Sequence, residues 1–477
     1  MLWLAFKDNF WYSSSEGPAL RIQRRMKHIS NSNEIEEKMK ENTTVIKGRI
    51  LIDGNGGDVL KNPVVIVEKK RIKEIGAEGA VNSPADAIEL DLSEYTLMPG
   101  LMDIHLHCSS HNVLTFKNYR IAQLEVTPPL QMLYALLHQQ IMFEMGFTTL
   151  RDHPWPNAYG GHNSAELVAL RDAIAAGIFA GPRLVVGGYA TMTGSHLDLI
   201  VPRGCRREPD ATADGPWELR KLARQQLRTG VDFIKTCASG GGGTDKEAPD
   251  VRNMTQEELD AVVDEAHALD KHCACHCFTP SAQKMALKAG ADTIDHCVFT
   301  DDEAIEMLVS EKKPIVPTLM HRSDRAIEVR RRIGTSAFTL NKMKSLQPYT
   351  KETFQRFIEA GVTIAMGTDT QLDPEMGSNA GELEIYVDYG MTPMQAIQTA
   401  TKNTAEAIRL GKETGTLETG KYADIIAIDG NPLKNIRILQ EKQKIKIVMK
   451  EGKIYVDRRP GNEKHVIHDQ DYAWTRI

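Results

Sequence analysis

Between residues 101 and 368, short apolar runs alternate with longer amphipathic segments, and this alternation restricts the possible fold more than any other feature. Amphipathic stretches such as 257–270 and 281–289 follow most of the runs. The predicted strands span residues 101–107, 147–152, 183–188, 232–238, 273–277, 293–297, 314–319 and 363–368. Eight strand–helix units predict an α/β fold of the (β/α)8 TIM-barrel type, in which functional groups lie at the carboxyl ends of the strands.

The first predicted strand carries a His-x-His pair. Its polar residues Asp103, His105 and His107 alternate with apolar ones, as expected for a strand with two different faces. Side chains at positions i and i+2 share a face, about 7 Å apart along the chain, so two imidazoles can converge on one metal ion. A half-exposed strand with two polar residues would give the same pattern. The metal interpretation therefore depends on further ligands at later strand ends.

Residues with the required chemistry do stand at those ends. Lys235 interrupts an apolar strand, where a buried lysine is unfavourable unless it has a partner or a function. His276, His296 and Asp369 end the fifth, sixth and eighth predicted strands. Taken singly, each residue has a structural explanation, such as a core histidine or a turn aspartate. Their common position at the matching strand ends favours a metal site.

The set resembles the pattern of the amidohydrolase superfamily, and the resemblance extends over residues 44–460. The family carries His-x-His on the first strand, a carboxylated lysine on the fourth, histidines on the fifth and sixth, and an aspartate on the eighth. Segments 390–408 and 415–429 resemble the family's closing helix and return strand. The chain is thereby identified as a member of the superfamily.

Within the superfamily, the chain is most similar to the imidazolonepropionase-like branch, near the Xaa-Pro dipeptidases, ochratoxinase, and the molinate and phenylurea hydrolases. This narrower resemblance depends on FIKTCASGG (233–241), on the spacing between His276 and His296, and on GTDT (367–370).

The resemblance implies two divalent metal ions, which we expect to be Zn²⁺, with Co²⁺ or Mn²⁺ as alternatives. It implies that carbon dioxide is bound as a carbamate on Lys235, as an anionic bridge between the metals. It also makes Asp369 the catalytic residue, which takes a proton from water and passes it to the leaving nitrogen. The implied metal ligands are His105, His107, Lys235, His276, His296 and Asp369.

The bridging lysine also separates two reaction classes. Mononuclear deaminases and imidazolonepropionases of the superfamily lack it, and many place a glutamate base shortly after the fifth-strand histidine. Here Phe278-Thr279-Pro280 follows His276 instead. We therefore favour binuclear hydrolysis over deamination. A non-catalytic scaffold is disfavoured because all six ligand positions are retained.

Three residues are predicted to contact the substrate. Dipeptidase-like members typically carry a second histidine where this chain has Phe278, which favours an apolar or aryl substrate. His196 follows the third strand, and Arg322 follows the seventh, where a cation can hold a carboxylate. The run 330–332, Arg-Arg-Arg, is interpreted as a solvated helix face.

We predict hydrolysis of an amide, carbamate or urea C–N bond in an apolar or aryl-containing small molecule. The alternative is a Xaa-Pro-type dipeptidase or an N-acyl amino acid hydrolase, because a peptide or N-acyl amino acid would supply the carboxylate.

Outside the barrel, short strands separated by turns recur at both ends of the chain. They predict one small β-sandwich domain built from residues 43–97 and 412–460, next to a barrel of residues 98–411. Residues 1–42 are interpreted as an N-terminal extension and 461–477 as a C-terminal tail.

Composition limits the partners. Hydrophobic residues make up 41% of the chain, charged residues 26%, and the net charge is -6, which gives no reason to expect a nucleic-acid or membrane partner. Seven cysteines without a secretory signal favour a cytoplasmic location. Cys273, Cys275 and Cys277 alternate on one strand and are predicted to pack as small apolar groups. We expect a small-molecule substrate and a homo-oligomer.

Overall fold

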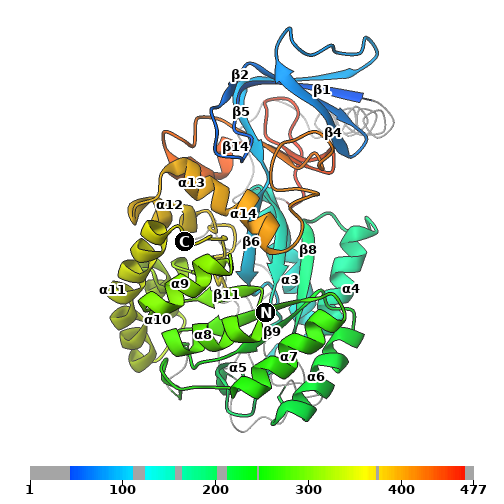
Figure 1. Ribbon diagram of the computed structural model, residues 1–477. Coiled ribbons are helices and arrows are strands. Elements are labelled where there is room, and N and C mark those ends of the chain that lie inside the picture. Colours follow the sequence, from blue (N-terminus) through cyan, green and yellow to red (C-terminus); the bar gives the residue numbers. More distant parts are fainter. Residues whose placement is uncertain are drawn as a thin grey trace, which may run out of the picture.

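A parallel barrel forms the larger part of the molecule (Figure 1). The computed structural model describes residues 43–110, 124–155, 164–200, 212–243, 246–371 and 375–467. The predicted extension 1–42 and residues 468–477 of the predicted tail lie outside these described residues. The barrel strands, each hydrogen-bonded to the next, are β6 (Leu101–Leu106), β7 (Phe147–Asp152), β8 (Arg183–Tyr189), β9 (Phe233–Cys237), β10 (His272–Cys277), β11 (Thr293–His296) and β12 (Ile315–Val316).

The eighth predicted strand closes the ring as an irregular segment. Ile364 forms a parallel bridge to Ile315 of β12, and Thr370 forms one to Leu106 of β6. The backbone N–H groups of Thr368 and Asp369 donate to the His105 carbonyl at 3.1 and 2.6 Å. The predicted TIM-type barrel is therefore confirmed, with the eighth position held by bridges rather than by a regular ladder.

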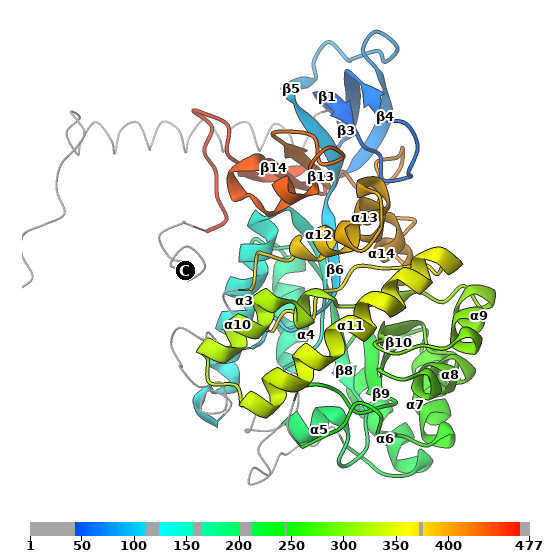
Figure 2. The same ribbon diagram turned by 90° about the vertical axis from the view of Figure 1, so that its left-hand side faces the viewer.

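Helices surround the barrel and bury their apolar faces against it (Figure 2). A capping box at Thr255 and Glu258 begins α7, whose buried face includes Leu259 and Val263. The α-helices are α3 (Pro128–Glu144), α4 (Ser164–Ala175), α5 (His196–Ile200), α6 (Pro216–Arg228), α7 (Gln256–Ala268), α8 (Pro280–Ala289), α9 (Asp302–Ser310), α10 (Asp324–Arg332), α11 (Ala337–Ala360), α12 (Gly381–Asp388), α13 (Pro393–Thr399) and α14 (Lys402–Ala407). Within the described part of the chain, no helix combines the length and the apolar character needed to cross a membrane.

A second, mixed sheet is built from both ends of the chain, as the sequence predicted. Its strand order is β15-β14-β13-β5-β1-β3-β4, and β2 pairs with β1. Residues from both ends share one hydrophobic core, for example Val65 and Ile447. The strands are β1 (Thr43–Leu51), β2 (Leu60–Lys61), β3 (Pro63–Glu68), β4 (Arg71–Ala77), β5 (Ile88–Pro99), β13 (Ile425–Ile428), β14 (Ile445–Lys450) and β15 (Lys453–Asp457).

This sheet curls back on itself around that core. Arg71 of β4 forms an antiparallel bridge to Tyr422, which precedes β13. Gly452, in the turn between β14 and β15, lies so close to the turn after β3 that a Cβ there would overlap the Lys69 carbonyl oxygen. Its φ of +74° also lies in the left-handed region that favours glycine. The two edges of the sheet therefore meet at one end.

β5 joins the two parts of the molecule. It runs to Pro99, and the first barrel strand begins at Leu101, so the chain passes from one sheet into the other across Gly100 (Figure 2). A Cβ at Gly100 would overlap the Thr148 side chain of β7, which accounts for glycine at the crossing. The strand that carries the His-x-His pair is thus anchored at its start in the small sheet.

The cysteines pack as predicted. Cys273, Cys275 and Cys277 are buried in the hydrophobic cluster between the barrel and its helices. All six cysteines in the described ranges are free and buried.

Candidate active site

The six predicted ligands lie together at the carboxyl end of the barrel. His105 is on β6, His107 directly follows β6, and Lys235 is on β9. The other three follow the same rule: His276 on β10, His296 at the end of β11, and Asp369 in the segment that closes the ring. All six are buried.

One group of ligand atoms comes from His105, His107 and Asp369, and these atoms all lie within 4.8 Å of one another. The Asp369 Oδ1 atom is 3.2 Å from His107 Nε2 and 3.8 Å from His105 Nε2. Burial alone would raise the pKa of the Asp369 carboxyl, but His321, His107 and His105 together hold it well below its usual value. Asp369 is therefore ionised at neutral pH, as a metal ligand and a proton acceptor must be.

His276 and His296 complete the cluster from the next two strands. The His296 ring centroid lies 4.5 Å from that of His276 and 4.7 Å from that of His105. Burial lowers the pKa of both His276 and His296 well below its ordinary value, so both rings are neutral, the form that binds metals. The Nδ1 atom of His296 lies 2.8 Å from the Thr318 hydroxyl, which fixes the ring.

Lys235 lies beside these rings, with its side chain almost fully buried. Its ammonium group donates to the Asp295 carboxylate. Asp295 also lies 3.1 Å from His105 Nδ1 and 3.8 Å from Arg151 Nη2. Burial would raise the pKa of Asp295, but Lys235 and His105 lower it overall. Asp295 is therefore a buried anion shared by three cationic or donor groups.

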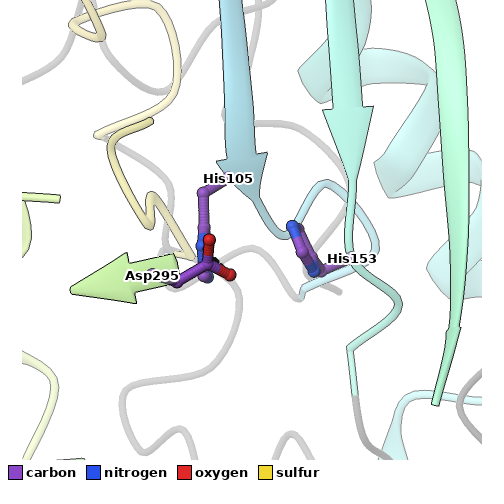
Figure 3. A group of neighbouring side chains, drawn as sticks. All are labelled: His105, His153 and Asp295. Carbon is purple, nitrogen blue, oxygen red and sulfur yellow. Dashed lines mark ion pairs between the residues drawn. The ribbon is translucent and has the colours of Figure 1, made fainter. Parts of the chain in front are cut away.

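Figure 3 shows a second group of potential ligands, His105, His153 and Asp295, whose ligand atoms also lie within 4.8 Å of one another. The His105 and His153 rings are stacked, with centroids 4.3 Å apart and planes 23° apart. Lone pairs of imidazole nitrogens lie in the ring planes, so two stacked rings direct them side by side rather than toward one ion. We therefore interpret Asp295 and His153 as supports that orient His105, the arrangement usual behind metal-binding histidines.

Two further aspartates fix the backbone at the strand ends. Asp103 accepts from the Thr368 hydroxyl at 2.7 Å and ties β6 to the closing segment. Asp152 accepts from the backbone N–H of Cys108 at 3.0 Å. Burial raises the pKa of Asp103 to about 6 and that of Asp152 to about 7.

An open cavity of about 730 Å³ leads to this cluster. The three predicted substrate contacts, His196, Phe278 and Arg322, all line it. The His196 ring stacks on His276 with a centroid distance of 4.3 Å, and its Nδ1 atom lies 2.8 and 2.9 Å from the two carboxylate oxygens of Glu247. The remaining lining side chains include Trp155, His321, Arg330, Met343, Leu346 and Gln371.

Sequence reasoning missed several of these residues. The interpretation of 330–332 as a solvated helix face is wrong for Arg330, which is 9% exposed and lines the cavity. It holds for Arg331 and Arg332, whose side chains are 59% and 64% exposed. The helical period puts Arg330 on the face of α10 that also buries Ala326 and Ile327, and this spacing was the available signal.

Comparison with known proteins adds independent evidence. The sequence profile of the amidohydrolase family matches residues 96–455. The chain is 28% identical to ochratoxinase of Aspergillus niger over 461 residues, which covers 92% of this chain and 90% of that protein.

Solved structures agree with these matches. A Xaa-Pro dipeptidase with bound methionine in the active site superposes with a TM-score of 0.77 at 31% identity, covering 87% of this chain and 99% of that one. The crystal structure of A. niger ochratoxinase gives a TM-score of 0.75 at 27% identity, with 91% and 99% covered.

Proposed function

This chain belongs to the amidohydrolase family and is a hydrolase that acts on carbon–nitrogen bonds, and from this premise we propose that it is a binuclear, metal-dependent enzyme. The family predicted from the sequence is thereby confirmed. The proposed reaction is hydrolysis of an amide, carbamate or urea C–N bond. The observation that carries the proposal is the cluster of imidazoles around an ionised aspartate at the carboxyl end of the barrel.

The donor set fits divalent metals of the zinc type. Such ions take histidine nitrogens and carboxylate oxygens, and the cluster offers four histidines and one carboxylate. Bound metals would supply a nucleophilic water at neutral pH and would polarise the scissile carbonyl. We propose that they are held by His105, His107, Lys235, His276, His296 and Asp369.

Lys235 would contribute as a carbamate formed with carbon dioxide. In this structure its side-chain nitrogen donates to the Asp295 carboxylate, a contact that carbamate formation would change. Once Lys235 lost its positive charge, Arg151 would remain near Asp295 as a counter-charge. We therefore expect Arg151 to stabilise the Asp295 carboxylate after Lys235 has been converted to a carbamate.

Two side chains have proposed roles at the reacting bond. Asp369 accepts the proton of the attacking water and returns it to the leaving nitrogen. His196 contacts the substrate through Nε2, because its Nδ1 atom is held by Glu247. Glu247 fixes the ring orientation and the tautomer.

The cavity supports a substrate with a large apolar or aryl part, since Phe278, Met343 and Leu346 form one wall. Arg322 in the same cavity favours the second candidate, an N-acyl amino acid or dipeptide hydrolase. The names of the two similar proteins, ochratoxinase and Xaa-Pro dipeptidase, give a starting point for the choice of substrates.

Metal analysis and two variants of Lys235 test the proposal. Purified protein from metal-replete cells should contain about two divalent metals per chain. Lys235→Ala should lose most of its activity toward N-acyl amino acids, anilides or phenylureas, and should regain part of it with added short-chain carboxylic acids, which can replace the carbamate. Lys235→Arg should not be rescued, because its guanidinium stays charged. One tightly bound metal and a fully active alanine variant would contradict the binuclear proposal.

A further inference from the structure

Two arginines stand in the wall of the cavity. Arg322 is 2% exposed and Arg330 9% exposed, and both line the cavity. Burial lowers the pKa of Arg322 to about 10, which still leaves the group charged at neutral pH. Among the described residues, no carboxylate lies within ion-pair distance of either guanidinium group. Within the described part of the chain, the wall therefore carries two buried positive charges without a carboxylate in direct contact.

Both guanidinium groups also have donors without acceptors. In Arg322, Nη2 donates to the Pro317 carbonyl at 3.0 Å, but Nε and Nη1 have no partner in the described part of the chain. In Arg330, Nη2 lies 3.0 Å from His321 Nδ1 and 3.4 Å from Gln371 Oε1, and Nε has no partner there. Charged donors left unpaired in a buried site are unfavourable, and a carboxylate ligand would satisfy them.

The carboxyl groups near the cavity are engaged elsewhere or lie beyond ion-pair distance of the two arginines. Glu375 is of the second kind: it is buried near Arg330, and burial raises its pKa against the opposing effect of Arg330 and Arg325. Asp369 is the carboxylate that lines it among the described residues, and it belongs to the metal cluster. Glu247 is paired with His196. Burial raises the pKa of Glu382, near Arg322, to about 8, so this group is neutral at pH 7. The positive charge of the wall therefore remains available to a ligand.

The two arginines stand at separate points of the wall. The Arg322 guanidinium carbon lies 5.5 Å from the centre of the Phe278 ring, whereas Arg330 contacts His321 and Gln371. They share no hydrogen-bond partner among the described residues. Two separate cations suit two separate anionic groups.

We propose that Arg322 and Arg330 form a two-armed anion subsite, and that the substrate is an N-acyl derivative of an acidic amino acid. One arginine binds the α-carboxylate and the other the side-chain carboxylate, while the acyl part lies against the apolar wall at Phe278 and Leu346. This inference rests on the proposed hydrolytic function and deepens it by naming the substrate class.

The test compares N-benzoyl-L-glutamate with two neutralised relatives, N-benzoyl-L-glutamine and N-benzoyl-L-glutamate α-amide, on the metal-loaded enzyme. The kcat/KM for the glutamate compound should exceed that for each relative by roughly 10- to 100-fold, the value of one charge-assisted contact. Arg322→Met should remove one of the two preferences, and Arg330→Met the other.

Arg331→Met is the matched control, because Arg331 stands next to Arg330 on α10 with an exposed side chain, and it should keep both preferences. Arg322→Lys and Arg330→Lys retain the charge and should keep part of each preference if the methionine variants fold poorly. Equal kcat/KM for the three compounds in the wild type would overturn the proposal. Loss of both preferences in a single variant would also overturn it, because that result indicates one carboxylate held by both arginines.

Binding is measured separately, as the rise in Tm of the metal-loaded protein with each compound. A larger rise with N-benzoyl-L-glutamate than with N-benzoyl-L-glutamine would support the anion subsite. If no compound were hydrolysed, the assigned substrate class would be refuted, whereas the proposed hydrolytic function would still be decided by the metal analysis and the Lys235 variants. Equal rises, or none, would refute the subsite itself.

Discussion

Asp369 is the residue on which the proposed chemistry depends most. Asp369→Asn keeps the shape of the side chain but cannot accept a proton. We expect kcat to fall by roughly 10²- to 10⁴-fold, the usual contribution of a general base. Steady-state kinetics and metal analysis on the same preparation check this prediction, and metal should be retained. A variant with near-normal kcat would remove Asp369 from the mechanism.

The His196–Glu247 pair provides a second prediction at the residue scale. Glu247 is held by the Gly241 N–H at 2.8 Å and directs both oxygens at His196. If Glu247 acts by orienting His196, Glu247→Gln should lower kcat about 10-fold or more. The double variant with His196→Gln should then be little worse than His196→Gln alone, because residues that act as a unit are not additive. If the two substitutions lowered kcat additively, Glu247 would act mainly by holding the loop at Gly241 and not by orienting His196.

The sequence predicted all six metal-ligand candidates, but not every residue that supports them or lines the cavity beside them. Each candidate ligand lies on a short strand or directly after one, and the barrel rule brings the carboxyl ends of all strands to one place. Glu247 lies instead in a loop after β9, and Asp295 reaches His105 from a strand on the other side of the barrel. Such contacts depend on how loops and strands pack across the barrel, which no local pattern records. Arg330 is a different case. Its spacing from Ala326 and Ile327 placed it on the buried face of the helix, but its charge favoured the prediction of a surface position.

At the scale of elements, the segment that closes the barrel is a tight junction near the site. A Cβ at Gly367 would overlap Val316 and lie 2.6 Å from the His105 Cβ. Gly367→Ala should therefore push this segment away from β6, with a loss of about 1–3 kcal/mol in the free energy of unfolding and weaker metal binding. Gly57→Ala, at a position with open space around it, is the control. Urea denaturation measures the free energy of unfolding, and metal titration measures metal affinity. Equal values of both quantities for the two variants would contradict the proposed close packing at Gly367.

Element boundaries followed from the sequence where apolar runs were short and isolated. The strands of the barrel were predicted to within one or two residues, with two exceptions. β12 has two residues where 314–319 was predicted, and the predicted strand 363–368 is an irregular segment held by isolated bridges. β5 was missed although it is the longest strand, at 12 residues. Charged and polar residues such as Asp91, Glu94 and Tyr95 interrupt its apolar pattern. Its course is set by pairing with β1 and β13, which are distant in the sequence.

At the scale of the whole molecule, buried carboxyl groups should shape the pH dependence of stability. Burial raises the pKa of Glu382 to about 8, above its usual value near 4.5. The folded state therefore binds a proton that the unfolded state has released between about pH 4.5 and 8, and this group's contribution to stability falls as the pH rises through that window. Glu382→Gln stays neutral, so its stability relative to the wild type should increase from pH 5 to pH 8. Parallel Tm profiles for the two proteins would show that Glu382 is not protonated in the folded state.

The course of β5 has a consequence for the order of events during synthesis. β5 leads directly into the strand of His105 and His107, yet it pairs with β13, which follows the entire barrel in the chain. While the ribosome is still making the barrel, β5 has no partner on that side, so the start of the His-x-His strand is not yet held in place. Pairing between residues so far apart in sequence forms late and slowly. Metal loading should therefore be a late step, and the ions acquired will be those offered to a nearly complete chain rather than to an emerging one.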